Sequence, residues 1–430
     1  MTRAKSAASL ASIGLASALL VGCGASQAPI SAPGVTPPTS AIAPARSAAH
    51  RLSVSYRQLH RFHVSVNGVN PAAGLLDVNG TLYGTTPYGG SSNMGTVYSI
   101  STSGVYKVLY QFQGGSAGSR PSSGLLDVNG TIYGTTAGGG TANDGTVYSV
   151  STSGVEKVLY AFKGGSDGIA PSGGLLDLNG TLYGTTVQGG GYTCAVSGPN
   201  CGTVFSVTTT GQETVLHRFA GGSDGAQPHG GLINVKGVLY GTTLNGGNTG
   251  NSGAGTVFSI TPDGVEKVLY EFQGGSDAAF PWSGLINVNG LLYGTTNGGG
   301  QASSVGYGTV YNISTSGDEK VIYRFAAADG AFPQAGLIDV NAVLYGTTAS
   351  GGGKHTCYRL GSHNCGTVFS ITTAGVETVL HRFAGGTDGF DPVAPLANVN
   401  GTLYGTTYRG GGRRGNHDRL AHGTVFALTP

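Results

Sequence analysis

Two short strings recur seven times along this chain, and they restrict its architecture more than any other sequence feature. Successive copies lie about 50 residues apart, and the two strings alternate. A period of this length, with several strands in each unit, is typical of a β-propeller in which each repeat forms one blade. The string LYGTT or IYGTT begins at Leu82, Ile132, Leu182, Leu239, Leu292, Leu344 and Leu403. The string GTV begins at Gly95, Gly145, Gly202, Gly255, Gly308, Gly366 and Gly423.

Each repeat contains the pattern of four short strands. Asn79 and Gly80 separate the first two strands of the first repeat, and Asn-Gly is a strong hairpin signal because a type I′ turn needs positive φ at both positions. The last two strands carry apolar residues on both faces, as a blade packed between two neighbours requires. In the first repeat the four predicted strands span residues 74–78, 81–86, 95–101 and 105–112.

The two ends of the repeat region predict how the blades close. Residues 423–430 match a third strand, and no fourth strand follows them. Upstream of the first repeat, residues 55–62 match the fourth-strand pattern of 214–219 and 378–383. We therefore expect an all-β, seven-bladed β-propeller with four strands per blade, whose last blade is completed by the N-terminal strand. A β-helix or open stack is the competing interpretation, but it would need caps rather than a permuted end.

Composition excludes several other classes of protein. Glycine contributes 79 of 430 residues, yet it follows no three-residue period, which excludes collagen. Charged residues make up only 10% and hydrophobic residues 39%, a balance unlike that of a disordered polar chain. The net charge of +2 gives no basic excess, so we expect no nucleic-acid partner.

The repeat unit resembles the glycine-rich tandem repeat called GloVer, found in bacterial secreted and anchored proteins. The pattern NGTLYGTT…GG…GTVYSI…G.EKVLY.F.GGSDG carries the resemblance, which extends over residues 53–430. That family is defined by its repeat, so the resemblance implies a repeat fold and an exported protein without implying an activity.

The N-terminus has the pattern of a bacterial lipoprotein signal. Residues 1–23 combine an early charged stretch with a short apolar run that ends in LVGC, and we expect lipidation at Cys23. An ordinary signal peptide with a chance cysteine is the alternative. Residues 24–52, rich in Pro, Ala and Ser, are expected to form a disordered tether. We therefore expect a protein of the cell envelope, held in a membrane by its lipid anchor and exported to the outer membrane, on a side that the sequence does not specify.

Long variable loops are predicted on one face of the propeller, where the second and third strands of a blade connect. Variable loops on a rigid scaffold are where binding residues usually lie. Two of these loops each contain a pair of cysteines, Cys194 with Cys201 and Cys357 with Cys365. In an exported protein such local pairs predict two disulfides, and their spacing does not favour zinc.

The loops of the sixth and seventh repeats are rich in cations. They include Lys354, Arg359, Arg409, Arg413, Arg414 and Arg419, accompanied by His355, His363, His417 and His422. One hypothesis is a patch that captures an anionic glycan, phosphate-bearing lipid or lipopolysaccharide. The other is a solvated polar rim without a ligand.

A second candidate site lies where the loop between blades reaches the innermost strand, near the mouth of the central channel. The residue after the proline of this loop varies between repeats, and in one repeat it is Trp282, the only tryptophan in the chain. With His229, Phe280 and Gln334 it predicts a platform on which a sugar could stack. Alternatively, Trp282 fills the channel. The aspartates of these loops are expected to cap turns, because each loop supplies a single carboxylate rather than a calcium-binding set.

No catalytic signature appears in the sequence: G-x-S-x-G, H-E-x-x-H and Walker motifs are missing. We therefore expect no catalytic residues, cofactor or metal site, and a monomeric, non-catalytic binding or scaffolding module whose partner is a glycan or an envelope protein. The alternative is a carbohydrate-active enzyme, a polysaccharide lyase or glycoside hydrolase, with its site at the channel mouth.

Overall fold

A computed structural model describes residues 54–63, 67–194, 198–247, 253–301, 306–353, 365–412 and 421–430. The chain divides into two units, Met1–Arg51 and Leu52–Pro430, and the second unit is the propeller. The predicted signal peptide, Cys23 and the tether lie outside the described residues. Among the described residues, no helix has the length and apolar character needed to cross a membrane.

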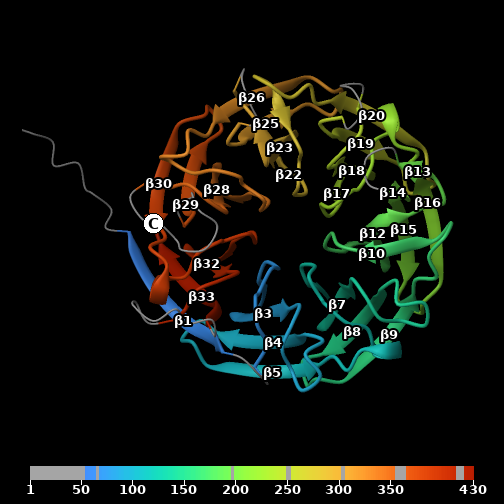
Figure 1. The fold of residues 1–430 in the computed structure, drawn as a ribbon, viewed down its shortest axis with the longest axis horizontal. Helices are drawn as coiled ribbons and strands as arrows, with labels where there is room; N and C mark the ends of the chain where they lie inside the picture. Colours follow the sequence, from blue (N-terminus) through green and yellow to red (C-terminus); the bar gives the residue numbers. More distant parts are fainter. Residues whose placement is uncertain are drawn as a thin grey trace, which may run out of the picture. The chain divides into compact units, whose positions relative to one another are not determined.

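The second unit is an all-β, seven-bladed propeller, as the repeats predict. Each blade is a four-stranded antiparallel sheet, and the colours of Figure 1 follow the chain around the ring from blade to blade. Blade 1 contains β2 (Leu76–Val78), β3 (Thr81–Thr86), β4 (Thr96–Ser101) and β5 (Tyr106–Gln111). Blade 2 contains β6 (Leu126–Val128), β7 (Thr131–Thr136), β8 (Thr146–Ser151) and β9 (Glu156–Ala161). Blade 3 contains β11 (Leu176–Leu178), β12 (Thr181–Gly189), β15 (Thr203–Thr208) and β16 (Glu213–Arg218).

The other four blades have the same order of strands from the centre outwards. Blade 4 contains β17 (Ile233–Val235), β18 (Val238–Thr243), β19 (Thr256–Ile260) and β20 (Glu266–Glu271). Blade 5 contains β22 (Ile286–Val288), β23 (Leu291–Thr296), β25 (Thr309–Ile313) and β26 (Glu319–Arg324). Blade 6 contains β27 (Ile338–Val340), β28 (Val343–Thr348), β29 (Thr367–Thr372) and β30 (Glu377–Arg382). Blade 7 contains β31 (Ala397–Val399), β32 (Thr402–Thr407), β33 (Ala421–Thr429) and β1 (Ser55–His63).

Blade 7 confirms the predicted closure. Its outermost strand is β1, which comes from the start of the repeat region and pairs antiparallel with β33 at its end. The register places Tyr56 opposite Leu428 and Gln58 opposite Phe426. In Figure 1 the blue β1 lies beside the red β33.

The hairpins form where the Asn-Gly pairs predict them. Asn79 and Gly80 have φ values of 53° and 80°, as a type I′ turn requires. The Asp77 carboxylate accepts a hydrogen bond of 2.9 Å from the Gly80 N–H, which holds the turn closed. The four strands of blade 1 begin and end within two residues of the predicted bounds.

Short elements extend this pattern on the loop face. Blade 3 has a fifth strand, because β12 continues far enough to pair with β10 (Gly168–Pro171). Most other blades make the same contact as a single bridge, such as Val69 with Tyr88, and blade 5 makes it as the short pair β21 and β24. The remaining elements are β13 (Thr193–Cys194), β14 (Gly198–Pro199), β21 (Ala278–Ala279), β24 (Gly298–Gly299) and the 3₁₀ turns η1 (Gly115–Ala117), η2 (Gly222–Asp224) and η3 (Gly386–Asp388).

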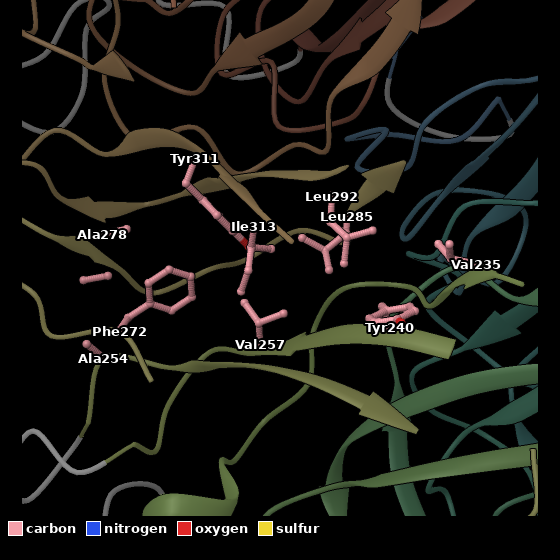
Figure 2. Close-up of a cluster of buried hydrophobic side chains, with 11 residues drawn as sticks. Val235, Tyr240, Ala254, Val257, Phe272, Ala278, Leu285, Leu292, Tyr311 and Ile313 are labelled. Carbon is pink, nitrogen blue, oxygen red and sulfur yellow. The ribbon is translucent and has the colours of Figure 1, made fainter. Parts of the chain in front are cut away.

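The hydrophobic core lies between neighbouring blades. Figure 2 shows one such cluster, in which Val257 and Phe272 of blade 4 face Tyr311 of blade 5. The rings of Phe272 and Tyr311 meet edge to face with centroids 5.1 Å apart, a favoured aromatic geometry. Equivalent ring pairs occur at all seven junctions, including Phe383 with Phe426 and Phe62 with Tyr98 on either side of blade 7.

The glycine of the LYGTT string makes room for these rings. Gly84 lies directly opposite Tyr98 on the neighbouring strand. A Cβ atom on Gly84 would lie 2.4 Å from the Tyr98 hydroxyl oxygen. The repeated glycine therefore has a packing role, and its recurrence gives no information about function.

Candidate functional site

The candidate site at the channel mouth is built from one residue per blade. Each is the residue that follows the proline of the loop leading into the innermost strand. Trp282 is 39% exposed, whereas the other six are half-buried, so it is the side chain of this set that is most available to a ligand. The set consists of Ala72, Ser122, Ser172, His229, Trp282, Gln334 and Val393.

Backbone contacts between blades fix the position of Trp282. Phe280, two residues earlier, has a φ of 59°, in the left-handed region, and its N–H donates to the Ala254 carbonyl of blade 4 at 2.7 Å. The equivalent residue before the proline has a φ between 54° and 59° in every blade. This repeated conformation is costly for residues other than glycine, and the interblade hydrogen bond helps to maintain it. The loop therefore presents Trp282 from a defined backbone.

Glycine allows the neighbouring loops to come close enough for their side chains to meet. A Cβ on Gly230 would lie 2.4 Å from the backbone nitrogen of Gly284, so the backbones of blades 4 and 5 are in direct contact here. His229 and Trp282 lie one and two residues before these glycines. Their rings stack with centroids 4.5 Å apart and an interplanar angle of 27°.

His229 is uncharged in this environment. Its burial lowers the pKa of the imidazole to about 4, so the ring is neutral at physiological pH. The Ser172 hydroxyl lies 3.5 Å from its Nδ1 and donates to the His229 carbonyl at 3.3 Å. Blades 3, 4 and 5 thus contribute Ser172, His229 and Trp282 to one group of side chains.

The other two predicted members of this site lie apart from the stacked pair. Phe280 packs against the hydrophobic cluster between blades 4 and 5, together with Ala254 and Phe272. Gln334 occupies the equivalent position in blade 6 and is half-buried. The contacts of the described residues therefore identify His229 and Trp282, with Ser172, as the centre of the candidate site.

Most of the predicted basic patch lies outside the described residues. This applies to Lys354, Arg359, Arg413, Arg414 and Arg419, and to His355, His363 and His417. Arg409 is described, and its guanidinium forms an ion pair of 3.3 Å with Asp391. It also lies 5.7 Å from the centroid of the Tyr408 ring. Arg409 therefore has an anionic partner within the protein itself.

One of the two predicted disulfides is present in the described residues. Cys194 is bonded to Cys201, with Cα atoms 5.4 Å apart, and the pair closes the long loop of blade 3. Cys365 is also disulfide-bonded, but its predicted partner Cys357 lies outside the described residues, so that pairing stays a prediction.

The loop aspartates cap turns, as expected. Asp224 accepts a hydrogen bond of 2.6 Å from the N–H of Ala220, and Asp388 accepts one of 2.7 Å from Ala384. Each also binds a histidine of the preceding outer strand, His217 or His381, at 3.1 Å. In other blades a tyrosine replaces the histidine, as in Tyr160 with Asp167 at 2.8 Å.

These junctions contain a third partner that the sequence did not predict. A glutamate begins the outer strand of the next blade and reaches the same tyrosine, as Glu377 does at 3.4 Å from the Tyr323 hydroxyl. Burial raises the pKa of Glu213, Glu319 and Glu377 to about 7. No local pattern in the sequence signals this arrangement, because the partners belong to different repeats.

One of these junctions combines three groups that can ligate a metal ion. His217 and Asp224 of blade 3 and Glu266 of blade 4 each supply one ligand atom, and these atoms lie within 4.8 Å of one another. Imidazole and carboxylate ligands suit zinc and related divalent ions. The sequence pattern suggested no metal site here, because the three residues are spread over 50 positions.

Comparison with solved structures finds similar chains at low sequence identity. A europium-containing methanol dehydrogenase aligns over 87% of this chain and 93% of its own, with 12% identity and a TM-score of 0.51. Phage phi92 endosialidase aligns over 87% and 68%, with 11% identity and a TM-score of 0.46. A luciferin-regenerating enzyme aligns over 70% and 88%, with 12% identity and a TM-score of 0.40. At 12% identity the likeness to the methanol dehydrogenase concerns the fold alone, and the other two alignments, with TM-scores below 0.5, support no conclusion.

Sequence comparison is more informative about the family. No curated protein matches the chain. The Gloeobacter/Verrucomicrobia repeat matches residues 49–197 and 191–426, which together include the described propeller almost completely. The resemblance inferred from the repeat pattern is therefore confirmed: this chain belongs to the Gloeobacter/Verrucomicrobia repeat family.

Proposed function

We propose that this protein is a non-catalytic binding propeller of the cell envelope that holds an uncharged sugar at its channel mouth. The observation that carries the proposal is the exposed Trp282 stacked on a neutral His229. We choose this pair over the basic loops because its two rings stack on each other, whereas Arg409, the one described arginine of those loops, is already paired with Asp391.

The chemistry of the pair suits the apolar face of a pyranose ring. An indole offers a large flat surface, and here one face is supported by the imidazole while 39% of the residue remains exposed. Because His229 is neutral, it adds no charge that would select an ionic ligand. The Ser172 hydroxyl, next to His229, is suitably placed to exchange hydrogen bonds with a sugar hydroxyl.

The same ring of residues gives no support to a hydrolytic mechanism. Most glycoside hydrolases place two carboxyl groups on either side of the scissile bond. The seven mouth residues, all of them described, include no aspartate or glutamate. We therefore prefer binding to the alternative of a glycoside hydrolase at the channel mouth.

The location in the cell remains part of the proposal. The lipoprotein-like pattern that ends at Cys23 supports a lipid anchor, and residues 24–52 would then space the propeller from the membrane. A monomeric propeller on such a tether is suited to present its loop face to an envelope or matrix glycan.

A glycan array tests this function. The wild-type protein should retain at least one uncharged glycan, and Trp282→Ala should abolish that binding because the stacking surface is lost. Tyr192→Ala is the matched control, since Tyr192 is also an exposed aromatic residue, 50% accessible, but lies in the loop of blade 3. It should bind like the wild type.

Three outcomes would contradict the proposal. Retention of every glycan by Trp282→Ala would exclude the stacked pair as the site. Binding only to anionic glycans, weakening as salt rises, would instead indicate the basic loops that contain Arg413, Arg414 and Arg419. Cleavage of a bound glycan would indicate the enzyme alternative.

A further inference from the structure

We propose that the junction between blades 3 and 4 binds one divalent transition-metal ion of the Zn²⁺ class through His217, Asp224 and Glu266. The site lies on the outer rim of the propeller, where β16 and the η2 turn of blade 3 meet the first residue of β20. It is independent of the sugar-binding function proposed for the channel mouth.

The three side chains already converge. One ligand atom from each residue lies within 4.8 Å of the other two, and His217 Nε2 lies 3.1 Å from Asp224 Oδ1. Tetrahedral zinc with bonds of about 2.0–2.2 Å holds its ligand atoms roughly 3.4 Å apart. The arrangement therefore needs only a small contraction to coordinate an ion.

Other contacts orient the ligands. The Ala220 N–H donates to Asp224 Oδ2 at 2.6 Å, which leaves Oδ1 directed toward His217. The imidazole of His217 is held edge-on by Phe219, with centroids 4.8 Å apart. Such supporting contacts fix the orientation of metal ligands in known sites.

Glu266 provides an unused acceptor at the junction. Its Oε1 is buried and, among the described residues, accepts no hydrogen bond, as is also true of the equivalent glutamates at the other junctions; only here does a histidine lie beside both carboxylates. A buried carboxylate oxygen without a partner is costly, and a cation beside it would remove that cost. The side chains of His217 and Asp224 are 21% and 24% exposed, so an ion can enter from solvent and water can complete the coordination.

The other junctions show why this one differs. At the corresponding place blades 2, 4 and 5 have a tyrosine, whose hydroxyl donates to Asp167, Asp277 and Asp329 at 2.8, 3.1 and 2.7 Å. A phenol that donates to a carboxylate is a poor ligand for a divalent ion at neutral pH, because its proton must first leave. In the ion-free protein His217 Nε2 also donates to Asp224, at 3.1 Å. A neutral imidazole can carry its proton on Nδ1 instead, which frees Nε2 to bind an ion without loss of a proton from the ring.

One other junction repeats the His-Asp pair but lacks the second carboxylate. His381 and Asp388 of blade 6 repeat the pair of blade 3, but Tyr56 occupies the position of the glutamate and stacks on His381 with centroids 4.0 Å apart. Among the described junctions, only that between blades 3 and 4 combines an imidazole with both carboxylates.

Calorimetric titration of the chelator-treated protein with ZnCl₂ tests the proposal. We expect one ion per chain and an increase in Tm on binding, because the ligands bridge two blades of the folded state. His217→Tyr should abolish this binding while leaving the Tm of the metal-free protein unchanged, since it recreates the junction of blades 2, 4 and 5. Glu266→Gln should also abolish Zn²⁺ binding, and it tests the same site if the His217→Tyr variant fails to fold.

A gain-of-site variant makes the test stricter. Tyr270→His places an imidazole beside Asp277 and Glu319, and it should raise the stoichiometry from one ion to two. The proposal is overturned if the wild type binds no Zn²⁺ at millimolar concentration, or if His217→Tyr and Glu266→Gln bind it as the wild type does. A folded Tyr270→His protein that gains no ion would refute the sufficiency of the His-Asp-Glu set.

Discussion

The outer rim of the propeller contains two kinds of junction between blades. From blade 1 to blade 6, each junction pairs a glutamate of one blade with a tyrosine or histidine of the preceding blade, as in Tyr323 with Glu377. The two junctions that flank blade 7 have stacked rings instead. Tyr56 stacks on His381 with centroids 4.0 Å apart, and His60 stacks on Tyr106 at 3.9 Å.

The difference coincides with the one strand that reaches its blade from the far end of the repeat region. Both Tyr56 and His60 belong to β1, so this strand makes one ring stack with blade 6 and another with blade 1. Tyr56 also contacts Phe426 with centroids 5.6 Å apart, and its hydroxyl donates to the Asp388 carbonyl at 2.8 Å. Ring stacks bury surface without burying an ionisable carboxyl group, so they provide a firmer attachment than a half-buried glutamate.

Among the changes at these junctions, removal of β1 should have the largest effect on stability. Deletion of residues 54–63 leaves β33 as an open edge and removes both ring stacks. We expect aggregation, or loss of the cooperative unfolding transition, because an exposed long strand edge pairs with other chains. Differential scanning calorimetry and light scattering measure both effects. Deletion of residues 24–51, which belong to the other unit, is the control and should leave the Tm unchanged.

A pair of alanine substitutions compares the two kinds of junction directly. Tyr56 and Glu377 occupy equivalent positions at the start of the outer strands of blades 7 and 6. Tyr56→Ala should lower the free energy of unfolding by about 2–3 kcal/mol, since it removes a stacked and partly buried ring. Glu377→Ala should change it by less than about 1 kcal/mol. The free energy that this carboxylate gains from its contacts is largely cancelled by the cost of removing it from water. Equal effects in urea denaturation would refute the distinction.

The glutamate junctions should also make the stability of the protein depend on pH. This effect should be smaller than those of the β1 deletion and of the alanine substitutions. The pKa of Glu213, Glu319 and Glu377 is about 7 in the folded protein, against 4.5 as the ordinary value. The folded state therefore holds extra protons between these values. Their stabilising contribution is complete below the unfolded pKa and is lost as the pH rises through the folded pKa. Burial lowers the pKa of His60 from its ordinary value of 6.5 to about 4. This histidine therefore has the opposite effect: its contribution to stability is lost as the pH falls below 6.5.

A triple variant isolates the glutamates from the histidine. Glu213→Gln, Glu319→Gln and Glu377→Gln together imitate the protonated junctions at every pH. Between about pH 5 and about pH 8, in the presence of a chelator, the Tm of the wild type should fall by a few degrees relative to that of the variant. Parallel curves for the two proteins would mean that these carboxyl groups titrate at ordinary values.

Much of the fold could be predicted because the repeats present the same local signals seven times. The Asn-Gly pair at Asn79 and Gly80 predicted a turn whose φ angles the structure reproduces, and the likeness of residues 55–62 to a fourth strand predicted the closure by β1. The loop disulfide between Cys194 and Cys201 followed from its short spacing. These features are decided by residues close together in sequence or by a pattern repeated along it.

The candidate sites were less predictable, because they depend on contacts between repeats. The sequence marked Trp282 as unique, but its stacking on His229 required the close approach of two glycine backbones from different blades. The cluster of His217, Asp224 and Glu266 gave no signal, since its members belong to two repeats and each has a structural role within its own repeat.

The sequence by itself determined the number of blades, the four-strand unit, the hairpin turns and the strand that closes the ring. These features depend on hydrophobic period and turn residues within short segments, and on the recurrence of those segments along the chain. Only the tertiary structure decided which side chains meet across a junction. Each of the two blades at a junction contributes one partner to the contact. The role of a tyrosine, histidine or glutamate there therefore depends on the residue that the adjacent blade places beside it. The closed ring brings those partners together, and it is there that Asp224 meets Glu266 of the next blade and Trp282 meets His229.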